Sequence, residues 1–227
     1  MEASHYSHSS SRILIVTAVL AEYEAIRRVM SSHTADRVDL HIAGVGPATA
    51  AASTAAYLAT RSDRYRLIIS AGIGGGFAPH APIGSIVLAD RIIAADLGSE
   101  TPEQGFISVD ELGFGRSVIQ ANRGYTERAA AVLQASNIPI HVGAVLTVST
   151  TTGSASTTAA LLRRIPDAAA EGMEGFGVAS AAQLFHIPIM ELRAISNLVG
   201  PRDRDRWQIA DALQSLGQAT RMLTEVL

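Results

Sequence analysis

Short apolar segments alternate with segments of helical pattern along most of the chain. The apolar segments have the length of buried strands, and they occupy residues 12–18, 38–43, 67–71, 86–95, 140–149, 168–171 and 187–196. Between them, helices are expected at residues 22–31, 48–60, 126–136, 154–164, 173–185 and 207–226. Strands that alternate with helices favour a mainly parallel sheet covered on both faces. The sequence therefore predicts an α/β fold, a single-domain three-layer sandwich around a mixed, mainly parallel twisted sheet.

The length of the chain, 227 residues, suits one compact domain, which we expect to span residues 12–227. Residues 1–11 are polar, rich in Ser and His, and lack the apolar region of a secretory signal. A disordered N-terminal tail is the expectation for them, and metal binding by His5 and His8 is a remote alternative. A cytoplasmic location follows as the default.

Composition argues against several classes of function. The net charge of −3 lacks the basic footprint of a nucleic-acid binder, and the apolar stretches are too short to span a bilayer. The absence of cysteine excludes disulfides, thiolate nucleophiles and Cys-based metal sites. A hydrophobic content of 48% with 19 glycines is typical of a packed, enzyme-like domain. We therefore expect no nucleic-acid partner, no membrane association and no metal.

Residues 99–124 interrupt the alternating pattern. They contain several glycines and a proline among charged residues, without clear periodicity. A structureless run of this length in a compact domain is usually a functional loop or an interface segment.

Two glycine clusters, at residues 44–46 and 72–76, invite a dinucleotide-binding interpretation. Such a fingerprint belongs in the first strand-to-helix turn, and here that turn, residues 17–21, holds no glycine. The second cluster is followed by Phe77-Ala78-Pro79 rather than by a helix. We expect no nicotinamide cofactor. The glycines are expected to let the main chain approach a ligand, and a tight turn without a ligand is the alternative.

Charged and amide side chains stand at strand ends and helix starts. Glu22 and Glu174 open helices, where an acid can also serve only to complement the helix dipole. Arg193 lies inside an apolar strand, and a buried arginine requires an anionic partner. Ser196 and Asn197 end that strand, at the edge where open α/β sheets bind ligands.

Taken together, these motifs resemble the purine nucleoside phosphorylase and nucleosidase superfamily over nearly the whole chain from Arg12. The resemblance rests on the order and spacing of Glu22, the turn at residues 44–46, residues 70–75, Glu171-Gly172-Met173-Glu174, and Arg193 to Asn197. It implies that residues 12–227 form a nucleosidase-like catalytic domain that needs no cofactor. It also implies a homodimer or higher homo-oligomer.

The resemblance also implies roles for individual residues. Glu174 with Met173 would hold the ribose, and Glu22 would activate water with help from Arg193 and Glu174. Ser196 and Asn197 would face the purine. Further substrate contacts are expected from Ser70, Ala71, Gly72, Thr151, Thr152 and Gly172.

Water is expected to be the nucleophile rather than phosphate. Phosphorylases of the superfamily commonly carry an arginine after the turn near Gly44, and here that turn continues as Pro47-Ala48-Thr49. The phosphorylases commonly use a second arginine near residues 91–95, and Arg91 could serve as that phosphate-binding cation. The alternative is that Arg91 is an ordinary surface residue. An acid at position 22 would repel phosphate. Hydrolysis of a nucleoside by water is the predicted reaction.

Asn197 indicates which purine base is released. Nucleosidases that act on 6-aminopurines usually carry aspartic acid there, which can protonate N7. An amide offers two donors and one acceptor, but no acidic proton. It can donate to O6 and N7 of a 6-oxopurine as negative charge develops. We therefore predict release of hypoxanthine.

Within the superfamily, the chain is most similar to the futalosine hydrolases, which release hypoxanthine in the alternative route to menaquinone. Residues 94–102 and 105–115 and the Glu174-Gly175-Phe176 sequence look like that branch. A methylthioadenosine/adenosylhomocysteine nucleosidase and a phosphorolytic 6-oxopurine enzyme stay open as alternatives. The base-stacking residue stays open too, as does a cation for the substrate carboxylate, with Arg202, Arg204 and Arg206 available. The aromatic part of futalosine could lie against Phe77, Phe106 or Phe114, from the same chain or across a dimer interface.

Overall fold

The structure is a computed structural model that describes residues 12–103 and 105–227. The tail expected at residues 1–11 lies outside the described residues. The strands are β1 (Arg12–Thr17), β2 (Val38–Ile42), β3 (Tyr65–Gly76), β4 (Ile86–Ala94), β5 (Gly98–Glu100), β6 (Phe106–Ser108), β7 (Val118–Gln120), β8 (Ile140–Thr147), β9 (Ala168–Gly172) and β10 (Ile189–Leu198). The helices are α1 (Leu20–Arg27), α2 (Ser32–Ala35), α3 (Pro47–Leu58), α4 (Arg123–Ala135), α5 (Ala155–Arg164), α6 (Gly175–Leu184) and α7 (Ile209–Val226).

The predicted mixed, mainly parallel sheet is confirmed. Its strand order is β10-β4-β8-β9-β3-β1-β2, with β7 added beside β4 and a further pairing between β10 and β3. Most neighbouring strands are parallel, and the antiparallel pairs are β10 with β4, β3 with β9, and β4 with β7. The carboxyl ends of β1, β3 and β10 therefore point the same way.

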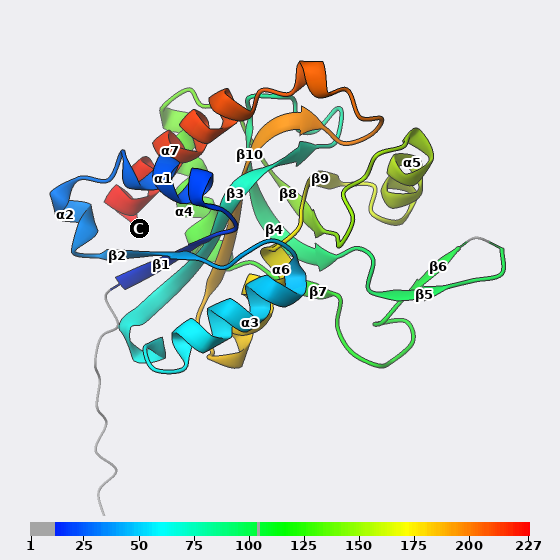
Figure 1. Ribbon diagram of the computed structural model, residues 1–227, viewed down its shortest axis with the longest axis horizontal. Helices are drawn as coiled ribbons and strands as arrows, with labels where there is room; N and C mark the ends of the chain where they lie inside the picture. Colours follow the sequence, from blue (N-terminus) through cyan, green and yellow to red (C-terminus); the bar gives the residue numbers. More distant parts are fainter. Residues whose placement is uncertain (1–11, 104) are drawn as a thin grey trace, which may run out of the picture.

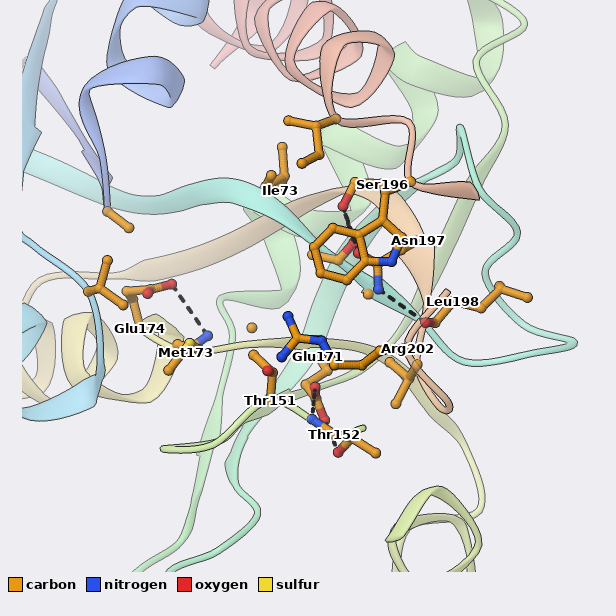
Figure 2. Close-up of a pocket in the computed structure, with 18 of the residues that line it drawn as sticks. Ile73, Thr151, Thr152, Glu171, Met173, Glu174, Ser196, Asn197, Leu198 and Arg202 are labelled. Atoms are coloured by element: carbon orange, nitrogen blue, oxygen red, sulfur yellow. Dashed lines mark hydrogen bonds between the residues drawn. The ribbon is translucent and has the colours of Figure 1, made fainter. Parts of the chain in front are cut away.

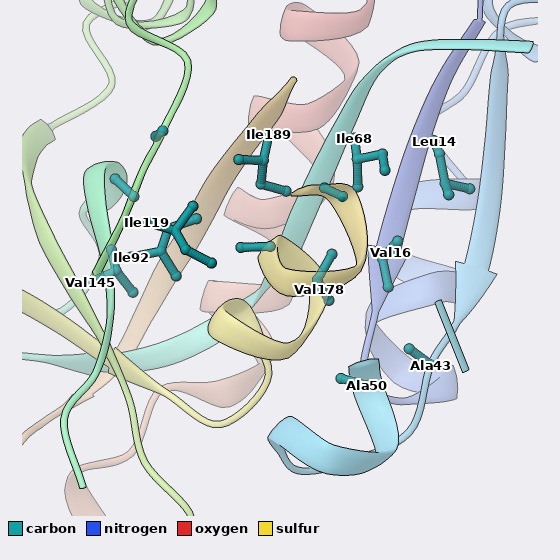
Figure 3. Close-up of a cluster of buried hydrophobic side chains, with 14 of the residues drawn as sticks. Leu14, Val16, Ala43, Ala50, Ile68, Ile92, Ile119, Val145, Val178 and Ile189 are labelled. Carbon is teal, nitrogen blue, oxygen red and sulfur yellow. The ribbon is translucent and has the colours of Figure 1, made fainter. Parts of the chain in front are cut away.

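Helices cover both faces of the sheet, so the three-layer arrangement is confirmed as well (Figure 1). One buried cluster joins the strands to α1, α4 and α7 through residues such as Ile26, Leu133 and Leu216. A second joins them to α3 and α6 through Ala50 and Val178, which face strand residues in Figure 3. Apolar side chains on both faces fix the sheet between two helical layers.

Strand β3 is longer than the sequence predicts, because it continues through the glycine cluster to Gly76. The tight turn kept as the alternative for residues 72–76 is therefore wrong. These glycines pair with β10 on one side, and Gly75 and Gly76 also pair with β9. At Gly76 a Cβ atom would lie 2.0 Å from the Ala81 carbonyl oxygen, so glycine is needed for close approach rather than for a bend.

The expectation of a structureless run at residues 99–124 is also wrong. Strands β5 and β6 pair as an antiparallel hairpin, which projects away from the sandwich in Figure 1. Strand β7 adds to the edge of β4, and α4 begins at Arg123. Strands of three residues offer too few positions for a period of two to be recognised.

Helix α3, rich in small residues, packs against the sheet and against α6. Its Ala50 and Leu58 share a buried cluster with Leu14 and Val16 of β1. At Gly177 of α6 a Cβ atom would lie 2.1 Å from the Pro47 carbonyl oxygen. Small residues thus let this helix approach its neighbours closely within one chain. In the part of the chain that the structure describes, no helix combines the length and apolarity needed to cross a membrane.

Candidate active site

A cavity of about 330 Å³ lies at the carboxyl ends of β1, β3, β9 and β10. This is the edge at which open α/β sheets bind ligands. Figure 2 shows side chains from these strands, and from the loops that follow them, converging on it. The predicted site residues that line it are Glu22, Thr151, Thr152, Gly172, Met173, Glu174, Ser196 and Asn197.

Four other predicted residues lie behind the cavity wall rather than on it. Ser70, Ala71 and Gly72 are buried in the middle of β3, and Arg193 is 2% exposed in β10. The Arg193 Nη2 atom donates to Ser70 Oγ at 3.4 Å. These four residues are therefore buried beside the cavity, and among them Arg193 donates to the pocket acid Glu174.

Glu22 is held by backbone amides on both carboxylate oxygens. It lies in the first turn of α1 and is 3% exposed. Its Oε2 accepts from the amides of Ala18 and Val19 at 2.9 and 3.3 Å, and its Oε1 accepts from the Ile73 amide at 2.9 Å. Burial raises the pKa of Glu22 above its ordinary value, although Arg193 and these amides oppose the rise. A buried carboxylate with a raised pKa and access to a cavity is suited to accept a proton.

Gly72 makes room for this acid. A Cβ atom there would lie 2.6 Å from Glu22 Oε1 and 2.7 Å from Arg193 Nη1. The pairing of β3 with β10 sets Gly72 directly opposite Arg193. The glycine in this strand therefore lets the Glu22 carboxylate and the Arg193 guanidinium, which come from distant segments, approach each other.

Glu174 links three segments of the pocket. It is the N-cap residue of α6 rather than a residue inside its first turn. Its Oε1 accepts from the Gly46 amide at 3.3 Å, and its Oε2 accepts from the Met173 amide at 3.3 Å and from Arg193 Nη1 at 3.4 Å. The glycine turn at residues 44–46 thus closes over the carboxylate instead of over a phosphate.

A buried ion pair anchors Arg193, and its acid was missed by sequence reasoning. Arg193 Nε donates to Glu191 Oε1 at 2.8 Å, and Glu191 is 1% exposed. The period of two in a strand places residues 191 and 193 on one face, so the pattern could have identified the partner. A Cβ atom at Gly175 would lie 2.2 Å from both Glu191 oxygens, which accounts for glycine after Glu174.

Negative charge dominates around the pocket floor. Arg193 faces Glu191, Glu174 and Glu22, whose charges raise its pKa above the ordinary value although burial acts to lower it. Three carboxylates around one guanidinium leave a surplus of acid. Such a site stabilises positive charge that develops on a bound group, and it repels an incoming anion.

The amide of Asn197 has a defined orientation. Its Nδ2 donates to the Leu198 carbonyl oxygen at 3.0 Å, and its Oδ1 accepts from Ser196 Oγ at 2.9 Å (Figure 2). A backbone carbonyl only accepts, so the amide nitrogen must face Leu198. The second hydrogen of Nδ2 stays available to an acceptor in the cavity.

Glu171 and Trp207 also line the cavity, although neither was predicted as a site residue. Arg202, one of the three arginines offered for the substrate carboxylate, lines it as well. Glu171 is the last residue but one of β9, while Arg202 and Trp207 belong to the loop before α7. The guanidinium carbon of Arg202 lies 5.3 Å from the centre of the Trp207 ring. The sequence could not show which of its arginines reaches the cavity, because the approach of this loop to the cavity depends on the fold.

The aromatic residues suggested from the sequence lie elsewhere. Phe77 is fully buried in a cluster with Leu146 of β8 and Leu161 of α5, so the suggestion that it contacts a ligand is wrong. Phe106 and Phe114 belong to the hairpin region and do not line this cavity. Within one chain, Trp207 is the aromatic side chain among the described residues that line it.

Arg91, the cation considered for phosphate, lies in a different pocket. It forms ion pairs with Asp90 and Asp167, and its pocket is lined by Phe106 and Arg164. Among the described lining residues, Arg202 is the cation that reaches the candidate site itself. Over residues 12–103 and 105–227, no group of three or more His, Asp or Glu side chains is arranged to hold a metal ion.

Comparisons with known proteins agree with this architecture. The family model described as the phosphorylase superfamily matches residues 12–227. A futalosine hydrolase of Streptomyces coelicolor is 48% identical, over 95% of this chain and 96% of that protein. One of Acidothermus cellulolyticus is 41% identical, over 92% of this chain and 89% of that protein.

A solved structure supports the fold. The native structure of futalosine hydrolase of Helicobacter pylori superposes with a TM-score of 0.82 at 17% identity, covering 97% of this chain and all of that one (100%). The family match spans the whole described domain, and the two relatives align over nearly all of their own length. The chain therefore belongs to the phosphorylase superfamily and, within it, to the family of its futalosine hydrolase relatives.

Proposed function

We propose that this protein hydrolyses the N-ribosidic bond of futalosine, releasing hypoxanthine and dehypoxanthine futalosine for menaquinone biosynthesis. The observation that carries the proposal is Asn197, whose amide presents a hydrogen to the cavity in which Glu22 and Glu174 meet. Two relatives at 48% and 41% identity bear the name futalosine hydrolase, which supports the same substrate.

Ribose binding falls to Glu174 in this proposal. Its carboxylate is fixed by Gly46, Met173 and Arg193, and the lone pair that stays free on Oε1 can accept from a ribose hydroxyl. These contacts hold the sugar over the acidic floor. Positive charge on the ribose in an oxocarbenium-like transition state is stabilised there.

Glu22 acts as the general base that activates the attacking water. The water oxygen forms the new bond to C1′, and one proton of the water passes to the Glu22 carboxylate. The bond from C1′ to N9 breaks, and its electron pair leaves with the purine. Asn197 donates a hydrogen bond to the purine edge, where negative charge spreads onto O6 and N7. Phosphate is a poor alternative nucleophile, because Glu22 and Glu174 repel it and Arg91 lies in another pocket.

The reaction is expected to slow as the pH falls. Water activation needs ionised Glu22, and burial raises the pKa of this acid, so the carboxylate is lost at a higher pH than in an ordinary glutamate. The acidic limb of kcat/KM should have an apparent pKa above about 4.3, the ordinary value for glutamate. Rates are measured from acid to neutral pH, with melting temperatures over the same range to exclude unfolding. A rate that rises towards acid would contradict the role of Glu22 as the base.

Arg202 is expected to bind the substrate carboxylate at the mouth of the cavity. It lines the cavity, its guanidinium packs on Trp207, and no ion pair is recorded for it within the described chain. Arg202→Gln should raise KM for futalosine by roughly 10-fold, since a charge-assisted hydrogen bond is lost.

Steady-state kinetics with futalosine and with inosine, which has no carboxylate, measure this effect. Arg204→Gln is the matched control, because Arg204 also packs on the Trp207 ring, at 5.9 Å, but does not line the cavity. An equal rise in KM for both nucleosides would show that Arg202 supports the loop instead of reading the carboxylate.

A panel of nucleosides tests the proposed function. Futalosine, its 6-amino analogue, methylthioadenosine and inosine are incubated with and without phosphate, and the released bases are identified. Hypoxanthine from futalosine is the expected main product. Adenine release at an equal rate would favour the methylthioadenosine/adenosylhomocysteine nucleosidase alternative, and strict phosphate dependence would favour the phosphorolytic one.

Assembly into a homodimer or larger homo-oligomer and a cytoplasmic location belong to the same proposal. The projecting β5–β6 hairpin and the 83% exposed Phe114 offer apolar surface for contact between copies. Light scattering on the purified protein measures the assembly.

A further inference from the structure

Glu171 lines the cavity, but the proposed hydrolysis by Glu22, Glu174 and Asn197 gives it no role. It is 5% exposed and lies at the end of β9, on a segment separate from Glu22 and Arg193. Burial raises its pKa, and two hydrogen bonds from Thr152 oppose that rise. An acid this buried is costly unless a partner compensates it.

The strand register places Glu171 opposite Asn197 across a glycine. Gly75 of β3 pairs with Asn197 of β10 on one side and with Glu171 of β9 on the other. Directly paired residues share a face of the sheet, and both side chains line the cavity. Two strand spacings separate their main chains by about 10 Å.

Gly75 and Val199 line the cavity between these side chains. A Cβ atom at Gly75 would lie 3.3 Å from Asn197 Nδ2 and 2.8 Å from a Val199 methyl group, so no side chain fits at position 75. The stretch of cavity between Glu171 and Asn197, here called the slot, therefore receives no side chain from Gly75, the β3 residue paired with both. A purine with one hydrogen bond on each edge spans a similar width.

Thr152 fixes the acid in place. Its amide donates to Glu171 Oε1 at 2.8 Å, and its hydroxyl donates to Oε2 at 2.5 Å (Figure 2). Each carboxylate oxygen keeps a further lone pair. The slot thus has an acceptor wall at Glu171 and a donor wall at Asn197, whose Nδ2 carries a free hydrogen.

We propose that Glu171 is a specificity-determining residue that accepts a hydrogen bond from N1–H of a 6-oxopurine, while Asn197 donates to the opposite edge. Hypoxanthine carries hydrogen on N1 and acceptors at O6 and N7, which matches both walls. Adenine has an unprotonated N1, and its lone pair would face the carboxylate. The inference rests on the proposed function for its choice of base, but base binding tests it without any turnover.

Calorimetric titration of the purified protein with hypoxanthine, adenine and 7-deazahypoxanthine is the main test. Glu171→Gln keeps the shape and both Thr152 contacts, yet offers an amide in place of the charged acceptor. The preference for hypoxanthine over adenine should fall roughly 10-fold or more, as expected for a lost charge-assisted hydrogen bond. The ratio of affinities for hypoxanthine and 7-deazahypoxanthine should be the same in the variant and in the unaltered protein, because N7 faces Asn197 and not Glu171. Glu127→Gln, on the surface of α4, is the matched control.

An acid that only braced the Thr152 loop would weaken all three bases alike, and that result would overturn the inference. A measurement on the unaltered protein needs no variant. 1-Methylhypoxanthine lacks the N1 hydrogen and should bind at least about 10-fold more weakly than hypoxanthine, and equal affinity would also overturn the inference. Failure to hydrolyse futalosine would instead contradict the proposed function and leave these base-binding results in force.

Discussion

Glu22→Gln is expected to lower kcat by about 10²- to 10⁴-fold, the usual contribution of a general base. The amide cannot accept a proton from water, and its NH₂ group would face one of the amides of Ala18, Val19 or Ile73 that now donate to the carboxylate. Binding of futalosine, measured by calorimetry, should change only a few-fold, because Glu174 and Asn197 keep their contacts.

Glu24→Gln is the matched control for this variant. Glu24 is on the same helix but points outwards and pairs with Arg27 at 2.8 Å. Its loss should leave turnover unchanged. Turnover of the Glu22 variant at the unaltered rate would remove Glu22 from the mechanism, and a lowered melting temperature would reveal a fault in folding.

Asn197→Asp is expected to move the preference from 6-oxopurine towards 6-aminopurine nucleosides. Ser196 Oγ can still donate to one oxygen, but the Leu198 carbonyl now faces a second oxygen, which favours the protonated carboxylic acid. Once this acid turns from the Leu198 carbonyl, it can donate its one proton to N7 of adenine, and its other oxygen can accept from the 6-amino group. The ratio of kcat/KM for futalosine to that for its 6-amino analogue should fall at least about 10-fold, with ~10⁴-fold as the upper range for a hydrogen-bonding site.

Asn122→Asp gives the same chemical change far from the pocket. Asn122 caps α4 by accepting from the Tyr125 amide at 3.1 Å, a task that aspartate performs equally well. Selectivity of this control should match that of the unaltered protein. An unchanged selectivity ratio in the position-197 variant would mean that the side chain does not read the base.

Much of the architecture could be predicted from the sequence, because apolar runs and helical periods report burial directly. The layers, the mainly parallel sheet, the position of Glu174 at a helix start and the positions of Ser196 and Asn197 near a strand end followed from such patterns. Segments whose structure depends on partners were missed. The glycines at 72–76 form a strand only because β10 and β9 pair with them, and the three-residue strands β5 and β6 depend on each other.

Site residues that belong to a sequence motif could be predicted. Site residues that reach the cavity only through strand pairing or loop packing could not. Sequence patterns placed Glu22 and Asn197 at a ligand-binding edge. They could not show that Glu171 faces Asn197 across Gly75, since that relation depends on strand register. Nor could they show that Trp207 and Arg202 reach the cavity from the loop before α7.

The most direct test of the central claim is the release of hypoxanthine from futalosine by the purified protein, with and without phosphate, with mass analysis of the sugar product. The structure leads us to expect equal rates in both conditions and dehypoxanthine futalosine with a free anomeric hydroxyl. A sugar phosphate as the product, or no hypoxanthine at all, would contradict the account.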